Sequence, residues 1–201
     1  KITASGLMSL SQKMNRILSV FESKEIELAP AENFHDILEY YISADIRGRG
    51  AEGVQADAVI RGGTFDQTLI LLNGVNISDP QTGHHSLNIP VSLNQIERIE
   101  FLNGKSAGIY SPSAFSGAIN IITKEPAGYS AMLYAGTGSY GYRNFDLAGN
   151  FETGKMAHLV YGSVKKSDGY IENTDFKISS IYYSNIIKTD RGIMDWQAGL
   201  S

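Results

Sequence analysis

The hydrophobic and polar positions of this chain change their pattern near Pro126. Before that residue, Phe34 begins a series whose apolar members recur at positions 37, 38 and 41, and Asn33 precedes it as a suitable N-terminal cap. This spacing predicts an amphipathic helix. The other apolar runs predict a short helical segment at 23–28 and strands at 17–21, 44–47, 58–61, 68–72, 96–102 and 118–123.

A tight turn is encoded by Asn73-Gly74, because both central residues of a type I′ turn need positive φ. We therefore expect 68–72 and 75–77 to form a hairpin, followed by a polar loop at 78–88. Strands interleaved with short helices indicate an α+β domain of about 125 residues.

After Pro126 the chain has the two-residue alternation of half-buried strands. The clearest run is 143–152, where apolar residues hold one parity and mostly polar residues the other. Turn residues separate the runs, which predicts a meander of about five antiparallel strands at 130–136, 143–152, 156–166, 176–187 and 193–201. On periodicity alone a soluble β-sandwich is favoured, although aromatic residues punctuate the strands as in outer-membrane barrels. The last residues resemble the middle of a strand, so we expect a fragment.

Composition removes several classes of function. The net charge of −4 offers no basic field for nucleic acid. The absence of cysteine excludes disulfide frameworks, thiolate zinc sites and cysteine nucleophiles. The longest uncharged run, 106–123, contains serine, glycine, proline and asparagine, so no membrane-spanning helix is expected. No paired-carboxylate spacing or Ser/His/Asp arrangement nominates a hydrolase.

Three motifs have alternative interpretations. Gly48–Gly53 satisfies G-x-G-x-x-G, with Asp66 near the spacing of a ribose-binding acid, but a dinucleotide site needs a helix to start there and strand residues follow instead. His84-His85 suits a metal or haem, yet without a third patterned ligand a polar loop is favoured. Asp168–Asp175 offers oxygen ligands for Ca²⁺ without the EF-hand pattern, which favours a solvated loop. We therefore assign no cofactor and no metal ligand.

The strand at 96–102 is unusual because it carries charges on both faces. Arg98 and Glu100 share one parity, and Glu97 holds the other. Unpaired buried ions are strongly unfavourable, so these side chains must reach water or charged partners. An exposed strand face meets this requirement, and so does insertion of the whole domain into a polar cavity.

Four stretches between Phe34 and Pro126, taken in order, resemble the plug domain of TonB-dependent outer-membrane receptors. They are Asp36–Glu39 leading to Ala44–Arg47; Ile60–Gly63; Leu71–Val75 with Asp79–His85; and Ile96–Glu100 followed by Ser113–Thr123. Within that family the chain looks most similar to the vitamin B12 receptor-like branch. It departs from the family pattern at Gly104-Lys105, where Gly-Pro is usual, and at Tyr110-Ser111, where Tyr-Gly or Phe-Gly is usual.

The resemblance implies an α+β plug domain at 1–126, with a small mixed sheet and short helices, inside a barrel of about 22 antiparallel strands that begins with residues 127–201. It implies a location in the outer membrane of a Gram-negative bacterium. It also implies active import of a scarce nutrient, such as cobalamin or a ferric siderophore, with the plug gating the barrel. In this family TonB pulls on an N-terminal segment, and Ile2-Thr3-Ala4 resembles the trailing end of that segment.

Polarity at loop positions suggests that the loops 48–55 and 78–88 face the nutrient. The substrate-facing candidates are Glu52, Gln55, Asp79, Gln81, His84 and His85. Charge pairing between plug and barrel is assigned to Arg61, Glu97, Arg98 and Glu100. Two other classes stay open beside this non-enzymatic receptor: a soluble β-rich binding or adhesion module, which fits the tyrosine-rich tail, and a nucleotide-dependent enzyme, which fits the glycine-rich loop.

Overall fold

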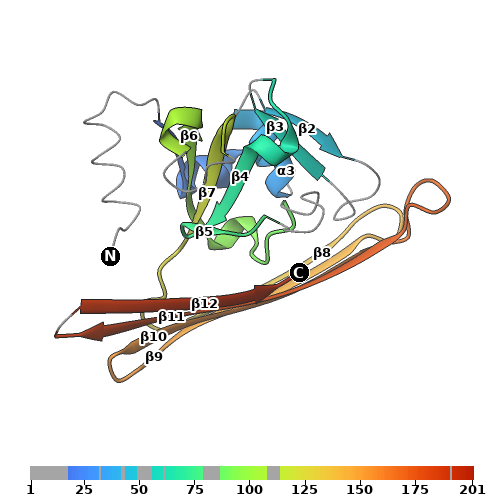
Figure 1. The fold of residues 1–201 in the computed structure, drawn as a ribbon. Coiled ribbons are helices and arrows are strands. Elements are labelled where there is room, and N and C mark those ends of the chain that lie inside the picture. The colour runs from blue at the N-terminus through green and yellow to red at the C-terminus, as the bar shows by residue number, and fades with distance from the viewer. Residues whose placement is uncertain are drawn as a thin grey trace. The chain divides into compact units, whose positions relative to one another are not determined.

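The computed structural model describes residues 18–31, 33–41, 44–48, 56–60, 62–78, 87–107, 114–190 and 192–201. These residues form two compact units, one within 18–49, 54–87 and 92–124 and the other within 88–91 and 125–201 (Figure 1). No helix in the described ranges is long and apolar enough to cross a membrane.

The first unit opens with strand β1 (Leu18–Glu22), the short helix α2 (Ser23–Leu28) and the helix α3 (Phe34–Tyr41). The expected cap of α3 is present, because the Asp36 N–H donates to Asn33 Oδ1 at 3.0 Å and the Asn33 N–H donates to Asp36 Oδ2 at 3.1 Å. The helix buries Phe34, Ile37 and Leu38. Its last apolar residue, Tyr41, is half-buried and donates its hydroxyl to the Glu25 carbonyl at 2.6 Å.

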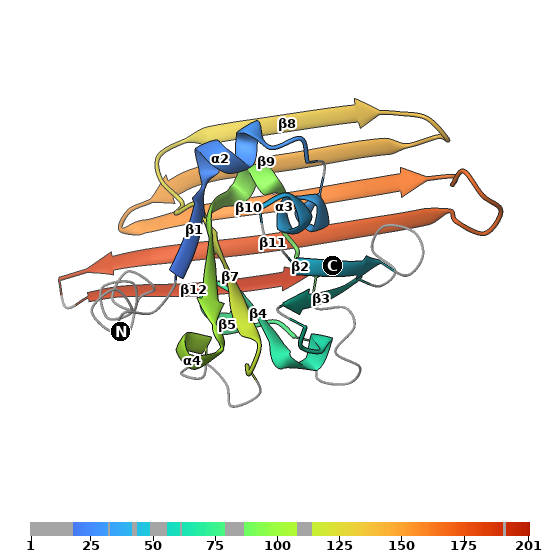
Figure 2. The same cartoon turned by 90° about the horizontal axis from the view of Figure 1, so that it is seen from above.

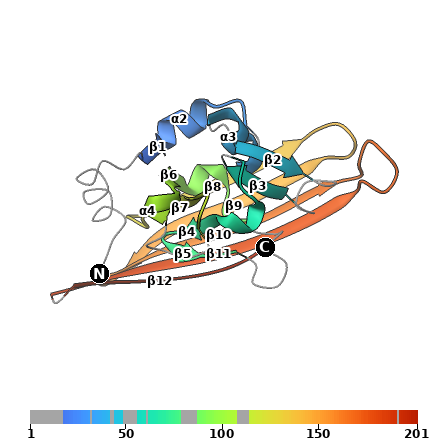
Figure 3. The same cartoon turned by 45° about the horizontal axis from the view of Figure 1, so that its top comes forward.

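Five strands build the main sheet of this unit: β1, β4 (Thr68–Leu72), β5 (Val75–Asn76), β6 (Ile96–Asn103) and β7 (Gly117–Thr123). Their order is β1-β6-β7-β4-β5, and β4 pairs with β7 in parallel while the other pairs are antiparallel (Figure 3). The strands β2 (Ala44–Gly48) and β3 (Ala56–Ile60) form a separate antiparallel pair. Short 3₁₀ turns at Phe65–Gln67 and Leu93–Gln95 precede β4 and β6, and the one-turn helix α4 (Gly104–Ala107) follows β6. The expected α+β fold with a small mixed sheet is therefore confirmed.

The core of the first unit lies around β4, which is buried at every position. Burial on both faces explains why Thr68–Leu72 is a continuous apolar run rather than an alternating one. One cluster on β4, β6, α4, β7 and the residues just before β7 comprises Leu69, Leu71, Leu102, Ala107, Ala114 and Ala118.

The second unit is the expected antiparallel meander. It contains β8 (Ser130–Thr137), β9 (Arg143–Thr153), β10 (Met156–Ser167), β11 (Phe176–Thr189) and β12 (Gly192–Leu200). Each strand pairs with the next along the chain, and the views in Figures 1 and 2 show the five running side by side. Strand β3, not a helix, occupies 56–60 after the glycine motif, so the dinucleotide interpretation has no helix to use within the described residues.

The alternation of β9 is confirmed by exposure. Phe145, Leu147 and Phe151 are exposed, whereas Asp146 and Ala148 between them are buried. Across the strands Leu147 is paired with Leu133, and Phe145 is paired with Val164, so one face of this sheet is predominantly apolar and exposed. The residues of that face include Leu133, Phe145, Leu147, Val160, Val164, Ile181 and Leu200.

The hairpin turn of the first unit generates a prediction. Asn73 and Gly74 have φ of 51° and 81°, as a type I′ turn requires. Alanine at position 73 strains this backbone and also removes three side-chain hydrogen bonds to Thr123. We expect Asn73→Ala to destabilise the first unit by about 1–3 kcal/mol. Amide hydrogen exchange of β4 and β7 in the complete protein measures this loss, with the exposed Asn94→Ala as control; equal exchange in the two variants contradicts the prediction.

Candidate functional site

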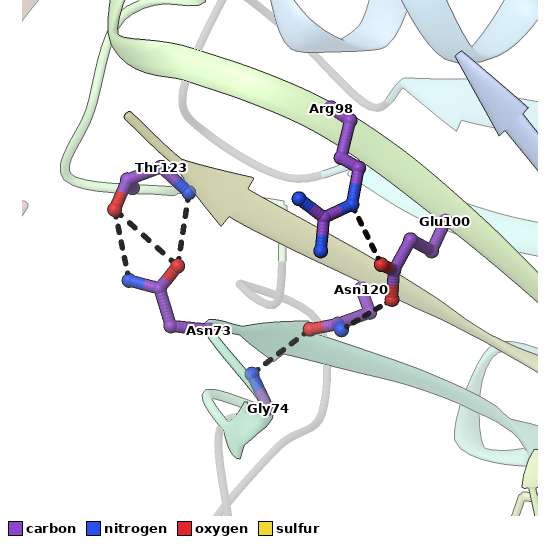
Figure 4. Close-up of polar contacts among 6 residues, drawn as sticks. All are labelled: Asn73, Gly74, Arg98, Glu100, Asn120 and Thr123. Carbon is purple, nitrogen blue, oxygen red and sulfur yellow. Dashed lines mark hydrogen bonds and ion pairs between the residues drawn. The ribbon is translucent and has the colours of Figure 1, made fainter. Parts of the chain in front are cut away.

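Most residues singled out from the sequence lie outside the described residues. This holds for the substrate-facing candidates, for one of the four charged residues and for the N-terminal segment, namely Glu52, Gln55, Asp79, Gln81, His84, His85, Arg61, Ile2, Thr3 and Ala4. Glu97, Arg98 and Glu100 on β6 are described. Around two of them the structure assembles a connected set of polar groups, the sheet network, made of Asn73, Gly74, Arg98, Glu100, Asn120 and Thr123 (Figure 4).

The sheet network begins with an ion pair between neighbours on one face of β6. Arg98 Nε donates to Glu100 Oε1 at 2.8 Å. Glu100 is only 2% exposed, so the pair is shielded from water on the carboxylate side. Of the two arrangements considered from the sequence, an exposed strand face is therefore wrong for Glu100, because its charge is balanced inside the unit.

Asn120 carries the network from β6 to the hairpin turn. Its Nδ2 donates to Glu100 Oε2 at 2.9 Å, and its Oδ1 accepts the Gly74 N–H at 2.9 Å. Since a carboxylate only accepts and a backbone N–H only donates, these two bonds fix the orientation of the Asn120 amide. Asn120 is fully buried, and both of its polar atoms are satisfied.

The same turn is held a second time at the end of β7. Asn73 Nδ2 donates to Thr123 Oγ1 at 3.0 Å, while Asn73 Oδ1 accepts the Thr123 N–H at 2.9 Å. The Asn73 N–H donates to the Ile121 carbonyl at 2.8 Å. Figure 4 shows the two halves side by side, with the ion pair on one side and the Asn73–Thr123 contact on the other. The turn is thus fixed to β7 by side chains as well as by backbone.

Glu97 is set apart from this network by an irregularity in β6. The pairing of β6 with β7 shifts between Ile96 and Arg98, which leaves Glu97 without a partner residue on β7. Such a bulge re-aims the side chain of the extra residue. Among the residues that the structure describes, the half-buried Glu97 carboxylate has no hydrogen bond and no ion pair.

The network is suited to holding three strands together rather than to chemistry. Its groups are mutually satisfied, and nothing in it provides a nucleophile beside a base. No group of three or more His, Asp or Glu within the described residues is placed to hold a metal ion. Sequence reasoning identified the Asn73-Gly74 turn and the two charges, but missed Asn120 and Thr123. Their only local signal was polarity within the apolar run 117–123.

A second polar cluster lies on β10, β11 and β12. Trp196 Nε1, which can only donate, bonds Asn185 Oδ1 at 3.0 Å and thereby turns Asn185 Nδ2 toward His158 Nδ1, also at 3.0 Å. His158 Nδ1 also lies 2.7 Å from the Tyr183 hydroxyl. The imidazole stacks on Phe151 with 4.6 Å between ring centroids. This cluster joins three adjacent strands through side chains.

The fold agrees with comparisons to known proteins. Residues 11–118 match the family described as TonB-dependent Receptor Plug Domain, and the chain belongs to that family. A vitamin B12 transporter, BtuB of Vibrio vulnificus, is 30% identical over 155 residues, which are 76% of this chain and 25% of that protein. BtuB of Vibrio cholerae is 28% identical over 155 residues, which are again 76% of this chain and 25% of that protein. The chain thus spans about a quarter of the length of these curated relatives.

Solved structures extend the likeness through the second unit. A ferric enterobactin receptor, PfeA of Pseudomonas aeruginosa, superposes with a TM-score of 0.73 over 96% of this chain and 33% of that one, at 20% identity. The siderophore receptor PirA of Acinetobacter baumannii gives a TM-score of 0.70 over 99% of this chain and 33% of that one, at 21% identity. At this identity the likeness shows the fold: a plug followed by antiparallel strands, as in these receptors. The relatives are transporters and receptors, and the alternative of a soluble adhesion module finds no support among them.

The buried ion pair generates a prediction. In Glu100→Gln the carboxylate is lost, and Arg98 keeps its charge without the anion that it contacts. We expect the plug to lose about 1–3 kcal/mol of stability. Amide hydrogen exchange of β4 and β7 in the complete receptor measures the change. Glu97→Gln is the matched control, because it removes a carboxylate one residue before Arg98 that has no partner among the described residues; equal exchange in the two variants would contradict the role given to Glu100.

Proposed function

We propose that this chain is the plug and the first barrel strands of an outer-membrane receptor that imports a scarce nutrient of the cobalamin or ferric siderophore class. Residues 1–126 are the plug domain and 127–201 the first barrel strands. One observation carries the proposal: a plug-family segment is followed directly by an antiparallel meander with one exposed apolar face, in a chain 28–30% identical to vitamin B12 transporters.

The apolar face supports a location in the outer membrane of a Gram-negative bacterium. Strands that alternate apolar and polar residues expose one face to lipid when they continue into a closed barrel. Strands β8 and β12 are the outer strands of the described sheet, where further strands of the complete receptor would pair. In this role the protein is a transporter and not an enzyme, and it uses no cofactor.

TonB is the proposed partner for energy coupling. Family membership is the support for this assignment, and Ile2-Thr3-Ala4 is the segment of this chain that resembles the end of the TonB-binding stretch. Those three residues lie outside the described part of the chain.

The loops 48–55 and 78–88 are proposed to contact the nutrient. Changing both His84 and His85 to alanine removes two polar side chains from the second loop. We expect nutrient binding by the complete receptor to weaken about thirtyfold, because two hydrogen bonds are lost and each contributes about 1 kcal/mol. Equilibrium binding of cyanocobalamin and of ferric enterobactin measures the effect, with the exposed Asn94→Ala as control. Affinities equal to wild type would remove this loop from the binding site.

Glu97 is the proposed plug residue for charge pairing with the barrel. Arg98 and Glu100 already neutralise one another, so a barrel group would have to compete with an existing ion pair for either of them. The bulge at Glu97 presents a carboxylate that has no ion pair among the described residues. Arg61 keeps the same assignment and lies outside the described residues.

The Glu97 assignment predicts a change in plug retention rather than in plug folding. In Glu97→Gln we expect the plug to leave the lumen more readily, with the exchange of its amides in β4 and β7 as slow as in wild type. Accessibility of a plug-specific cleavage site in purified receptor measures release. Glu100→Gln is the contrasting variant, since it is expected to speed exchange inside the plug itself. Release that matches wild type in Glu97→Gln would exclude the pairing.

A further inference from the structure

Three cationic residues lie directly opposite one another across three strands of the second unit. Lys166 on β10 is paired with Arg143 on β9 and with Lys177 on β11. All three residues are exposed. Neighbouring strands lie about 4.8 Å apart, so the three backbone positions span only about 10 Å. We call these three residues the basic row.

The basic row breaks the usual rule for cross-strand pairs. Like charges directly opposite one another on neighbouring strands repel and destabilise a sheet. Lys166 Nζ lies 3.3 Å from Asp168 Oδ1, but both side chains are more than half exposed, so this ion pair offsets little of the repulsion. Among the residues that the structure describes, Arg143 and Lys177 have no ion pair and no side-chain hydrogen bond.

An anion bound to the basic row would remove this repulsion, because it would attract all three cations at once. Positions that break a local rule are expected where the side chains serve a function. The cost of the like-charge pairs therefore points to an anionic ligand.

The basic row stands at one end of the exposed apolar face of the sheet. Side chains alternate along a strand, so Arg143 shares its face with Phe145 on β9, and Lys166 shares its face with Val164 on β10. Phe145 and Val164 are paired with one another and exposed. The apolar face therefore gives way to cationic side chains within two residues along each strand.

The other end of the same face carries no charge. There the register sets Thr153 and Ile187 opposite Met156, and Met194 opposite Ile187. A face that is cationic at one end only would meet anionic groups on one side of a membrane and not on the other.

The lengths of the connections indicate which side that is. Strands β9 and β10, and likewise β11 and β12, are joined by two residues each at the uncharged end. At the end of the basic row, five residues join β8 to β9 and eight join β10 to β11 (Figure 2). Outer-membrane barrels have short turns on the periplasmic side and longer loops on the extracellular side. The basic row then lies at the extracellular boundary of the hydrocarbon layer.

We propose that Arg143, Lys166 and Lys177 bind the phosphate groups of a glycolipid in the outer leaflet of the outer membrane. This inference rests on the proposed function, under which the apolar face contacts lipid. Arginine binds phosphate through paired N–H donors and lysine binds it as a point charge. Three cations within about 10 Å favour a lipid with more than one phosphate over a zwitterionic phospholipid, which has no net charge.

The probe is lipid A with two phosphate groups, added to the complete receptor in detergent after bound lipid has been removed. Arg143→Gln/Lys177→Gln removes the two cations that have no ion pair among the described residues. We expect its affinity for this lipid to fall about thirtyfold. Lys155→Gln/Lys188→Gln is the matched control, because it removes two cations from the opposite end of the sheet and should bind as the wild type does. Equilibrium binding measures both variants.

The melting temperature separates a loss of binding from a loss of folding. Without added lipid, Arg143→Gln/Lys177→Gln relieves the repulsion on Lys166, so this variant should melt at or above the wild-type temperature. With lipid A the order should reverse, because the wild type binds the lipid more tightly and gains more stability from it. A variant that melts below the wild type without lipid overturns the inference.

The binding measurements can overturn the inference in three further ways. These are an affinity of Arg143→Gln/Lys177→Gln equal to wild type, an equal loss in the control variant, and equally tight binding of phosphatidylglycerol, which has a single phosphate. If the wild type binds cyanocobalamin or ferric enterobactin and not lipid A, the inference is wrong while the proposed import role stands. If it binds lipid A and neither nutrient, the proposed function fails while the basic row keeps its ligand.

Discussion

The first unit depends on how it neutralises a carboxylate in the middle of its sheet. Glu100 is almost fully buried, and a buried carboxylate without partners would be strongly destabilising. Arg98 supplies the charge and Asn120 the second donor. Because Asn120 Nδ2 donates to Glu100, Asn120 Oδ1 on the other side of the amide points toward the Gly74 N–H and accepts from it. The position of the hairpin turn therefore follows from the ion pair on β6, two strands away in the sheet.

The sequence revealed those features that local patterns encode. The helix at 34–41, the alternation at 143–152 and the Asn73-Gly74 turn each follow from residues within one short window, and the structure has all three. The parallel pairing of β4 with β7 could not be inferred, because its partners are about fifty residues apart and no local signal names them. The same separation hid the partners of Asn73 and Gly74, which lie 50 and 46 residues further along the chain.

The charges of β6 illustrate a different limit. The sequence correctly placed Arg98 and Glu100 on the same face of β6, and it correctly required partners for their charges. The sequence could not tell whether the partner is water, a surrounding cavity or the neighbouring side chain, since all three satisfy the same requirement. The bulge between Ile96 and Arg98 also interrupts the alternation of side chains along β6. Odd and even positions before the bulge therefore do not predict which face a residue occupies after it. Glu97 is thereby separated from Arg98 and Glu100, with which the sequence had grouped it.

The internal neutralisation bears on how a plug of this kind can be released. A domain whose buried charges were paired with its surroundings would have to break those pairs, and leave ions unsatisfied, before it could shift. In this plug the Arg98–Glu100 pair and its hydrogen-bonded partners would travel together, since every bond of the network joins residues of one compact unit. Under the proposed function, the free-energy cost of moving the plug would then come from contacts that a few groups make with the barrel. Glu97, which has no partner among the described residues of the unit, is such a group. The network that keeps the plug folded is in this way also what allows it to move as one piece.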